Sequence, residues 1–511
     1  MADQNVCDIK LSPNLDDSLE YVRVVFTHCS DIVIRRFTLF HTTDAALLYV
    51  DGLIDKKQVE QDVIEPLMID RATLGVTPED MDLIERIGVH AANVTSVNTY
   101  TDAVEAALEG KAVLFLEGLK VSLVFGVAGW PQRSVNEPGT ESVIRGPREG
   151  FIESVGASVA MVRRRLRTTS FKTESMQIGR YTKTDVVVCY LETIADEKLI
   201  QEVRERLSRI DADGILESGY IEEWIEDNPY SPFPQVQNTE RPDVVAAMLL
   251  EGRVAILIDG TPFALLVPVN LWGALASPED YYERYIIATF IRWLRIAFAV
   301  ISLTLPSLYV AVSTFHQEFL PMPLLISIAA ARENTPLPAA VEAFFMEITF
   351  EALREAGVRL PKAIGQAVSI VGALVIGQAA VQAGIVSAPM VIIVAITGIA
   401  SFTVPRFNFA IAVRMLRFPI IILSGTLGIY GLIIGLIAII VHLSSLRSFG
   451  LPYLEPISPF QPSGLKDTLA RAPHWAMMDR PLQTSKKNKK RQTSAGYPHH
   501  RQPTQNQEER P

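Results

Sequence analysis

The chain has 511 residues, of which 49% are hydrophobic, and its formal net charge is −10. This total hides two unlike parts: residues 1–285 contain 46 acidic and 27 basic side chains, whereas residues 286–511 contain 11 acidic and 20 basic ones. The acidic first part argues against a nucleic-acid-binding protein, and the three cysteines, Cys7, Cys29 and Cys189, argue against a disulfide framework and a metal site.

The first residues of the chain are polar and acidic. Residues 1–30, which we interpret as an N-terminal arm, contain no apolar signal segment and no cleavage site. We therefore expect the first part of the chain to remain in the cytoplasm, where free cysteines stay reduced.

Two similar lobes are predicted at residues 31–135 and 185–285. A buried-strand pattern followed by an amphipathic helix occurs at residues 44–69 and returns at residues 185–210. A helix, two strands and a tryptophan follow in both lobes, and Gly110, Gly118 and Trp130 correspond to Gly252, Gly260 and Trp272 at a spacing of 142 residues. Alternating strands and helices predict a two-lobe soluble domain of α/β or α+β class. The cleft between such lobes could hold a ligand, but a scaffold or an assembly surface is the simpler explanation.

A basic connecting segment, residues 136–184, joins the lobes. It contains a predicted helix over residues 151–167, and its charged side chains include Arg145, Arg148, Glu149, Arg163, Arg164 and Arg165. Basic clusters can bind phosphate groups, but the acidic surroundings favour salt bridges. We therefore interpret these six residues as candidates for contacts with a neighbouring subunit.

An α-helical transmembrane bundle is predicted at residues 286–446. The 43 residues from Ala363 to Pro405 contain no Asp, Glu, Lys or Arg, and uncharged blocks also occupy residues 296–315 and 418–446. Because a membrane-spanning helix needs about 20 apolar residues, we expect about four to six spans. Arg292 and Arg295, in the opening turns of the first span, are expected to reach the lipid headgroups on the cytoplasmic side.

A short segment and an acidic helix interrupt the apolar blocks. Residues 321–331 are too short to cross a membrane, and the helix predicted at residues 339–357 carries four carboxylates: Glu342, Glu347, Glu351 and Glu355. The last three form one narrow stripe on the helix, and Glu342 lies off it. The stripe fits an interfacial helix that faces water, or a cation pathway lined by carboxylates, which would become rings in a homo-oligomer.

The number of membrane crossings stays open at this stage. Four spans with a re-entrant segment at residues 321–357 place both ends of the chain inside, whereas a fifth span there places the C-terminus outside. We favour an even number. Residues 447–476 form a post-membrane segment, and residues 477–511 are predicted to be a disordered basic tail whose Lys and Arg side chains either contact anionic lipids or keep the tail soluble.

No motif indicates an enzyme. The sequence lacks a P-loop, HExxH, GxGxxG and GxSxG, and its histidines are scattered. We therefore predict no catalytic residues, no metal and no cofactor.

Six segments carry a family resemblance: Asp31–Phe37, Tyr49–Leu53, Ile144–Phe151, Ser231–Gln235, Thr239–Asp243 and Pro338–Pro361. They resemble the A subunits of the GerA family of spore germinant receptors, and the run Ile144–Phe151 together with Thr239–Asp243 is the most specific part. The likeness extends from about Ser30 to Pro456.

The resemblance implies a multi-pass protein of the spore inner membrane whose N-terminal domain faces the spore core. Its partners would be a transporter-like B subunit, which binds the nutrient, and a lipoprotein C subunit. Copies of the A subunit would assemble around a nutrient-gated cation channel that triggers germination. Two alternatives remain: a membrane-anchored scaffold that clusters receptors without conducting ions, and the paralogous subunit associated with the dipicolinate channel.

Overall fold

The computed structural model describes residues 9–39, 43–68, 94–127, 129, 138, 139, 141, 143–359, 375, 377–462, 464–481 and 483–492. Trp130 and most of residues 363–376 therefore lie outside the described residues. The chain divides into two compact units, of which the first contains Met1–Glu226, Val236–Pro268 and His474–Pro511, and the second contains Asp227–Gln235 and Val269–Pro473.

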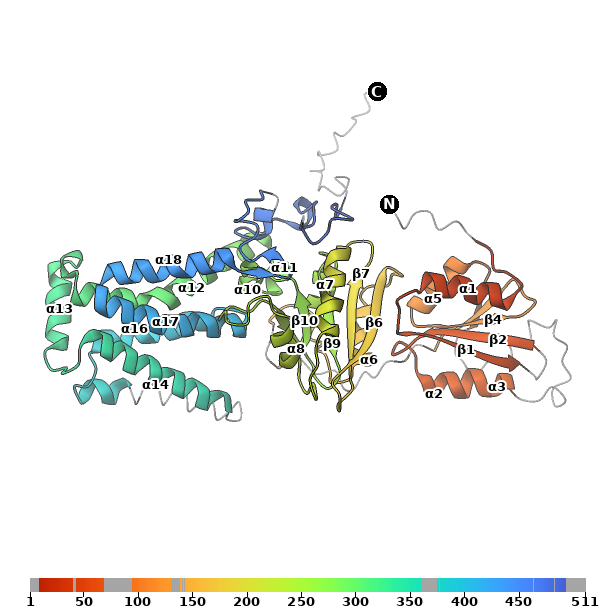
Figure 1. Ribbon diagram of the computed structural model, residues 1–511, viewed down its shortest axis with the longest axis horizontal. Helices are drawn as coiled ribbons and strands as arrows, with labels where there is room; N and C mark the ends of the chain where they lie inside the picture. Colours follow the sequence, from red (N-terminus) through yellow and green to blue (C-terminus); the bar gives the residue numbers. More distant parts are fainter. Residues whose placement is uncertain are drawn as a thin grey trace, which may run out of the picture. The chain divides into compact units, whose positions relative to one another are not determined.

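The first unit contains two five-stranded antiparallel sheets of identical strand order. One sheet has the order β1-β2-β4-β5-β3, with β1 (Ile32–Leu39), β2 (Thr43–Val50), β3 (Val94–Val97), β4 (Ala112–Leu116) and β5 (Ser122–Phe125). The other has the order β6-β7-β9-β10-β8, with β6 (Phe171–Ile178), β7 (Thr184–Leu191), β8 (Gln237–Thr239), β9 (Val254–Ile258) and β10 (Ala264–Val267) (Figure 1). The shared topology is what the repeat in the sequence predicts.

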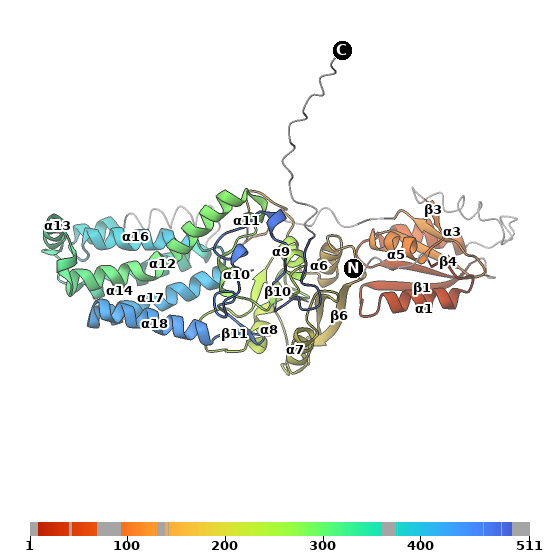
Figure 2. The same ribbon diagram turned by 90° about the horizontal axis from the view of Figure 1, so that it is seen from above.

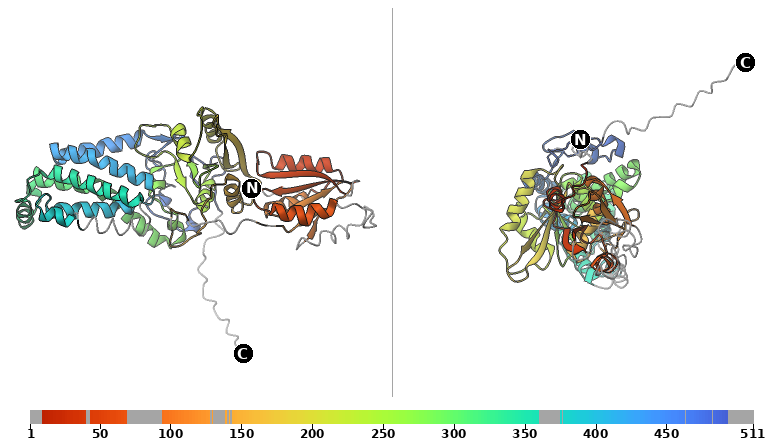
Figure 3. Two further views of the ribbon diagram at one scale, coloured as in Figure 1. Left: turned by 90° about the horizontal axis from the view of Figure 1, so that it is seen from below. Right: turned by 90° about the vertical axis from the view of Figure 1, so that its right-hand side faces the viewer.

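Helices cover both faces of the first sheet, as Figure 3 shows for the red lobe. One face packs on α1 (Leu15–Val25) and α5 (Tyr100–Leu108), and the other on the π-helix η1 (Val59–Ile64). This π-helix follows α2 (Lys56–Gln58) and continues into α3 (Glu65–Met68). This arrangement explains why every residue of β4 is buried, because a strand covered on both faces reads as a continuous apolar run.

The second lobe repeats the pattern with α6 (Val155–Arg163) and α9 (Pro242–Leu249) on one face of its sheet. It also contains α7 (Glu197–Ser208) and α8 (Ser218–Ile225). The two hairpin turns that join β4 to β5 and β9 to β10 place Gly118 and Gly260 at φ +86° and +85°, a backbone region that favours glycine. The matching glycines of the sequence repeat are therefore matching turns.

Two predicted segment boundaries are wrong. Residues 1–30 are not a separate arm, because α1 buries Leu15, Leu19 and Val22 in the core of the first lobe. Residues 136–184 are not only a connection, because α6 and β6 belong to the second lobe. Each lobe thus begins with a helix before its first strand, and the repeat is longer than the sequence pattern indicated. The helix predicted at residues 151–167 spans only Val155–Arg163.

The C-terminal tail is also described in part. Its residues 477–481 and 483–492 are ordered against the second lobe and make backbone hydrogen bonds among themselves, so the prediction of disorder is wrong for this stretch. Residues 493–511 lie outside the described residues. The post-membrane segment contains the short strands β11 (Arg447–Ser448) and β12 (Leu451–Pro452) and the 3-10 turn η5 (Gly464–Asp467), and η6 (His474–Ala476) follows.

The second unit is mainly helical. Its helices are α10 (Leu271–Leu275), α11 (Glu279–Tyr282), α12 (Tyr285–Thr314), η4 (Gln317–Phe319), α13 (Met322–Arg332), α14 (Ala339–Arg359), α16 (Ala388–Phe402), α17 (Phe407–Leu427) and α18 (Ile429–Ser445). Among the described residues, α12 and α17 are long and apolar enough to cross a membrane, and α13, α16 and α18 are shorter apolar helices. The longer helices lie side by side along their lengths (Figure 2).

Contacts between the helices fix their directions. We call the end of the unit where α12 begins its base and the opposite end its tip. Gly428, between α17 and α18, lies against His316 just after α12, so α17 runs from base to tip and α18 returns. At the base, the N–H of Leu271 donates to the carbonyl of Tyr453 (2.9 Å) and that of Val269 to Ser448 Oγ (3.0 Å). The first long helix therefore begins where the last one ends.

Helix α14 lies along the whole bundle. Near the tip, the Cα of Gly425 in α17 faces Ala340 of α14, and further down Arg417 of α17 contacts Glu347 of α14. The helix thus runs antiparallel to α17, from tip to base. The segment at residues 321–357, predicted to be re-entrant or to cross the membrane, contains α13 and α14, and α14 is as long as α17.

Candidate functional site: buried ion pairs of the helical unit

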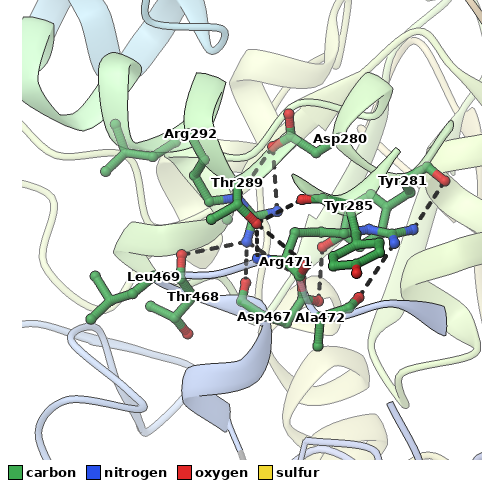
Figure 4. A network of polar contacts seen from close by, with 12 residues as sticks. Asp280, Tyr281, Tyr285, Thr289, Arg292, Asp467, Thr468, Leu469, Arg471 and Ala472 are labelled. Atoms are coloured by element: carbon green, nitrogen blue, oxygen red, sulfur yellow. Dashed lines mark hydrogen bonds and ion pairs between the residues drawn. The ribbon is translucent and has the colours of Figure 1, made fainter. Parts of the chain in front are cut away.

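A polar network surrounds the first turns of α12 at the base of the unit (Figure 4). Arg295 is 8% exposed and donates to both carboxylate oxygens of Asp280 on α11, at 3.1 and 3.2 Å. Arg292 is 2% exposed and donates to Asp280 (3.3 Å) and to Asp467 (3.4 Å). The prediction that these arginines reach lipid headgroups is wrong, because acidic partners hold both inside the protein.

The segment after the last apolar helix completes this network. The N–H of Arg471 donates to Thr289 Oγ1 of α12 (3.1 Å), and its guanidinium donates to the carbonyl of Tyr281 (3.2 Å). Tyr281 in turn donates its hydroxyl proton to Asp467 (2.9 Å). Residues 464–472 therefore clamp the beginning of α12, as the dashed contacts of Figure 4 show. Sequence reasoning missed Asp467, which lies 175 residues from Arg292 and carries no local signal.

A second set of ion pairs joins α14 to its neighbours in the middle of the bundle. Glu347 is 1% exposed and is paired with Arg417 of α17, which also donates to Ser302 Oγ of α12 at 2.9 Å. Buried charges of this kind are stable only when a partner and hydrogen bonds compensate their lost hydration. This pair therefore ties three helices together within one subunit.

The next carboxylate along α14 has two basic partners. Glu351 lies 3.4 Å from Arg414 of α17 and 3.5 Å from Arg354 of its own helix. Arg354 also donates to Ser401 Oγ of α16 (2.9 Å) and lies over the ring of Phe402. The two ends of α14 differ, because Glu355 is exposed and pairs only locally, with Arg359 four residues on.

The first carboxylate of α14 caps another helix. Glu342 is fully buried, and one of its oxygens accepts from the backbone N–H and the hydroxyl of Ser387, at 3.1 and 2.8 Å. Ser387 immediately precedes α16, so the negative charge lies at the positive end of that helix dipole. Arg332 of α13 approaches the other oxygen at 3.4 Å. Exposure of the four predicted carboxylates thus increases along α14, from buried Glu342 and Glu347 to exposed Glu355. The predicted alternative of an interfacial helix whose acidic stripe faces only water is therefore wrong.

Several buried polar atoms near these pairs lack hydrogen-bond partners. In the described part of the bundle they include Oε1 of Glu347, Nε of Arg417 and the hydroxyls of Ser307 and Ser424. An unsatisfied buried polar group costs roughly 1–3 kcal/mol. The interior of this apolar bundle therefore offers polar atoms that water or an ion could solvate.

The predicted subunit contacts lie in the first unit and fall into three groups. Arg163 is fully buried and donates to both carboxylate oxygens of Asp31 at 2.7 and 2.8 Å, which joins the two lobes of one chain. Arg164 and Arg165 both donate to Glu149, at 2.7 and 2.6 Å. Arg163 is therefore no subunit contact.

Two members of this set remain on the surface. Arg145 and Arg148 are exposed. Glu149 is partly buried, which by itself raises the pKa of its carboxyl, but hydrogen bonds from Arg165 and Arg164 outweigh burial and hold that pKa below its usual value.

In the residues that the structure describes, no group of three or more His, Cys, Asp and Glu side chains is placed to hold a metal ion.

Comparison with known proteins decides the family. The model of the family described as Bacillus/Clostridium GerA spore germination protein matches residues 20–483. The chain belongs to this family. The match includes both lobes, the helical unit and the clamp at residues 464–472.

Relatives from Bacillus subtilis are similar over nearly their whole length. The uncharacterized membrane protein YfkQ is 49% identical over 94% of this chain and 93% of its own. Spore germination protein KA is 46% identical over 95% and 89%, and spore germination protein B1 is 39% identical over 95% and 100%. A crystal structure of the N-terminal domain of the A subunit of the Bacillus megaterium spore germinant receptor GerK3 is 37% identical and covers 51% of this chain and 97% of that one, with a TM-score of 0.42.

These findings agree on the broad nature of the protein. It is a GerA-family spore germination protein with an N-terminal domain of strands and helices followed by a helical region. The two long apolar helices and the membrane protein among its relatives indicate association with a membrane.

Proposed function

We propose that this protein is the A subunit of a nutrient-sensing germinant receptor in the inner membrane of bacterial spores, and that its copies surround a cation path that opens during germination. The family and the relatives named as spore germination proteins support the receptor role. A transporter-like B subunit and a lipoprotein C subunit are the partners, and the chain itself is no enzyme.

An even number of membrane crossings fits the helix directions. The chain enters the bundle at the base with α12 and leaves it at the base after α18. Helices α14 and α16 both run from tip to base, because Ser387 lies against Glu342 and Ser401 against Arg354. Arg292, Arg295 and Arg406 lie at the base, which the positive-inside rule assigns to the cytoplasm, the spore core.

One observation carries the proposed ion path: the buried pair of Glu347 with Arg417. A carboxylate inside an apolar bundle attracts cations only when its own positive partner is displaced. With the pair closed, as here, the site is neutral and bound within one subunit. Separation of α14 from α17 would expose Glu347 and then Glu351 toward the subunit axis, and the pair therefore acts as the closed gate.

Removing single charges from α14 and α17 tests this function. In Arg417→Gln, Glu347 loses its positive partner, and we expect potassium to leak from reconstituted vesicles, or from spores, without nutrient; Glu347→Gln, which removes the carboxylate itself, should slow nutrient-triggered potassium release. Glu355→Gln is the matched control, because Glu355 is exposed and pairs only with Arg359. Normal ion release from Glu347→Gln and Glu351→Gln at normal protein levels would remove both residues from the path.

A scaffold that clusters receptors without conducting ions is the second candidate. It is favoured by the fact that all four carboxylates of α14 have a basic partner in the same chain, as expected for pairs that only hold helices together. Reconstitution of the purified oligomer in vesicles separates the two functions. An oligomer that passes no potassium with the complete receptor and its nutrient present would favour the scaffold.

A further inference from the structure

The C-terminal residues form a small hairpin on the second lobe. The N–H of Arg480 donates to the carbonyl of Lys489 (2.8 Å), and the N–H of Arg491 donates to the carbonyl of Met478 (2.7 Å). We call residues 478–491 the basic hairpin, because they include Arg480, Arg491 and four lysines. Within the first unit, this hairpin packs against the second lobe.

Three ion pairs join the basic hairpin to the acidic lobe. Lys486 lies 2.5 Å from Asp196, and Lys487 lies 3.3 Å from Glu197. Arg491 lies 2.9 Å from Glu251. Opposite charges thus meet at two separate places on the lobe, the beginning of α7 and the turn between α9 and β9.

The backbone of the hairpin also fits the lobe closely. Thr484 donates its hydroxyl to the carbonyl of Glu251 (2.6 Å), and Arg480 donates to the carbonyl of Leu250 (2.8 Å). Thr484 and Ser485 are buried, at 7% and 0% exposed. The carbonyl of Thr484 lies so near Gly252 that a Cβ there would approach it to 2.5 Å. The hairpin therefore occupies a formed surface and does not rest on the lobe through charges alone.

The acidic partner at α7 already has a structural role. Asp196 is the N-cap of α7 and accepts a hydrogen bond from the backbone of Lys198. Burial by itself raises the pKa of its carboxyl, but the hydrogen bonds from Lys486 and from the backbone outweigh burial and hold the pKa below its usual value. The docked hairpin therefore favours the ionised form of this cap.

We propose that Asp196, Glu197 and Glu251 form a docking surface for the protein's own basic hairpin, and that the hairpin is a latch held by charge. The latch attaches the chain that leaves the helical unit to the lobe that precedes it. Because the three pairs are only partly buried, salt or a dense anionic surface competes with them.

The hairpin contains its own matched control. Lys489 and Lys490 are exposed, and in the part of the chain that the structure describes no carboxylate partner is placed within ion-pair distance of either. The variant Lys489→Gln/Lys490→Gln lowers the charge of the hairpin without touching the docking pairs. The test variant Lys486→Gln/Lys487→Gln/Arg491→Gln removes the three pairs and leaves both lobes unchanged.

Amide hydrogen exchange of the full chain in neutral detergent, read by mass spectrometry on peptides from residues 477–492, tests the latch. We expect protected amides in the unmodified protein and in the Lys489/Lys490 variant at low salt. In the triple variant, or in 1 M sodium chloride, exchange should become about tenfold to a hundredfold faster. Peptides from β4 and β5, which belong to the first lobe and not to the docking surface on the second, serve as the folding control in every sample.

Three results would overturn the proposal. The first is fast exchange of residues 477–492 in the unmodified protein at low salt. The second is equal exchange in the two variants, which would mean that net charge and not pairing matters. The third is protection that appears only after transfer from detergent to phosphatidylglycerol vesicles, which would assign the hairpin to the lipid surface. Slower exchange in detergent than in those vesicles supports the latch, because the lipids then compete for it.

Discussion

Replacing Arg163 by alanine tests whether the two lobes of the soluble domain depend on one buried ion pair. Arg163 is fully buried, and its guanidinium binds Asp31 with two hydrogen bonds and the carbonyl of Phe171 with a third, at 2.9 Å. Thr173 adds a hydrogen bond to the same carboxylate (2.8 Å). Alanine would leave Asp31 buried without its counter-charge.

The magnitude follows from burial. Removing one partner of a buried ion pair costs about 3–5 kcal/mol, and the lost contact of Arg163 with the ring of Phe171, at 4.5 Å, adds about 1 kcal/mol. We therefore expect Arg163→Ala to lower the free energy of unfolding by about 4–6 kcal/mol, a large share of the roughly 5–15 kcal/mol of a typical domain. Arg164→Ala, which removes a more exposed partner of Glu149, should cost less than about 1 kcal/mol.

Pulse proteolysis in urea, applied to the full chain in detergent, measures this difference. A third variant, Asp31→Asn/Arg163→Met, removes both charges, and we expect it to recover part of the loss because no uncompensated charge remains. A loss within about 1 kcal/mol of that in Arg164→Ala would refute the reasoning. So would a double variant less stable than Arg163→Ala.

Three further outcomes follow from single positions. Burial and the neighbouring glutamates raise the pKa of Glu222 to about 7, so the folded protein prefers the protonated carboxyl and the stability that this form contributes is lost as the pH rises through 7. We therefore expect Glu222→Gln to be about 1–3 kcal/mol more stable than the unmodified protein at pH 8 but not at pH 4. Urea unfolding at both pH values measures this difference. Asp280→Asn weakens the shared partner of two buried arginines and should lower the thermal unfolding temperature of the solubilised protein; an unchanged value contradicts the network of Figure 4. In Gly252→Ala, the added Cβ strains a backbone at φ +82° and collides with the carbonyl oxygen of Thr484. Amide hydrogen exchange of the basic hairpin should become faster, while exchange near the buried pair of Arg163 and Asp31 should stay unchanged.

The soluble domain shows how far a local pattern reaches. The repeat could be predicted because turns need glycine at fixed places, and Gly118 and Gly260 keep their spacing whatever surrounds them. The first helix of each lobe was not recognised as part of the repeat, although a helix was predicted at residues 151–167. The reason is that the spacing between the lobes changes before β2 and β7, from 139 residues at β1 and β6 to 141. When the spacing between two repeats varies, a comparison of the sequence at one fixed spacing misses part of the repeat, whereas the identical strand order of the two sheets shows all of it.

The charged residues show where the sequence stops being informative. The apolar blocks and the carboxylates of α14 are visible in the sequence, but their environment is not. Glu347 meets Arg417 from 70 residues away, and Arg292 meets Asp467 from 175 residues away. In the sequence, each of these four charged residues looks like a surface residue, because its partner is far away along the chain.

The amino-acid sequence alone determined that an acidic, duplicated domain precedes an apolar helical part, because periodicity, composition and glycine spacing are properties of neighbouring residues. Tertiary structure alone decided which charges are buried: Arg163 against Asp31, Arg295 against Asp280, and Arg417 against Glu347. The reason is energetic, since an ionised side chain can leave water only where a distant part of the chain supplies its opposite charge.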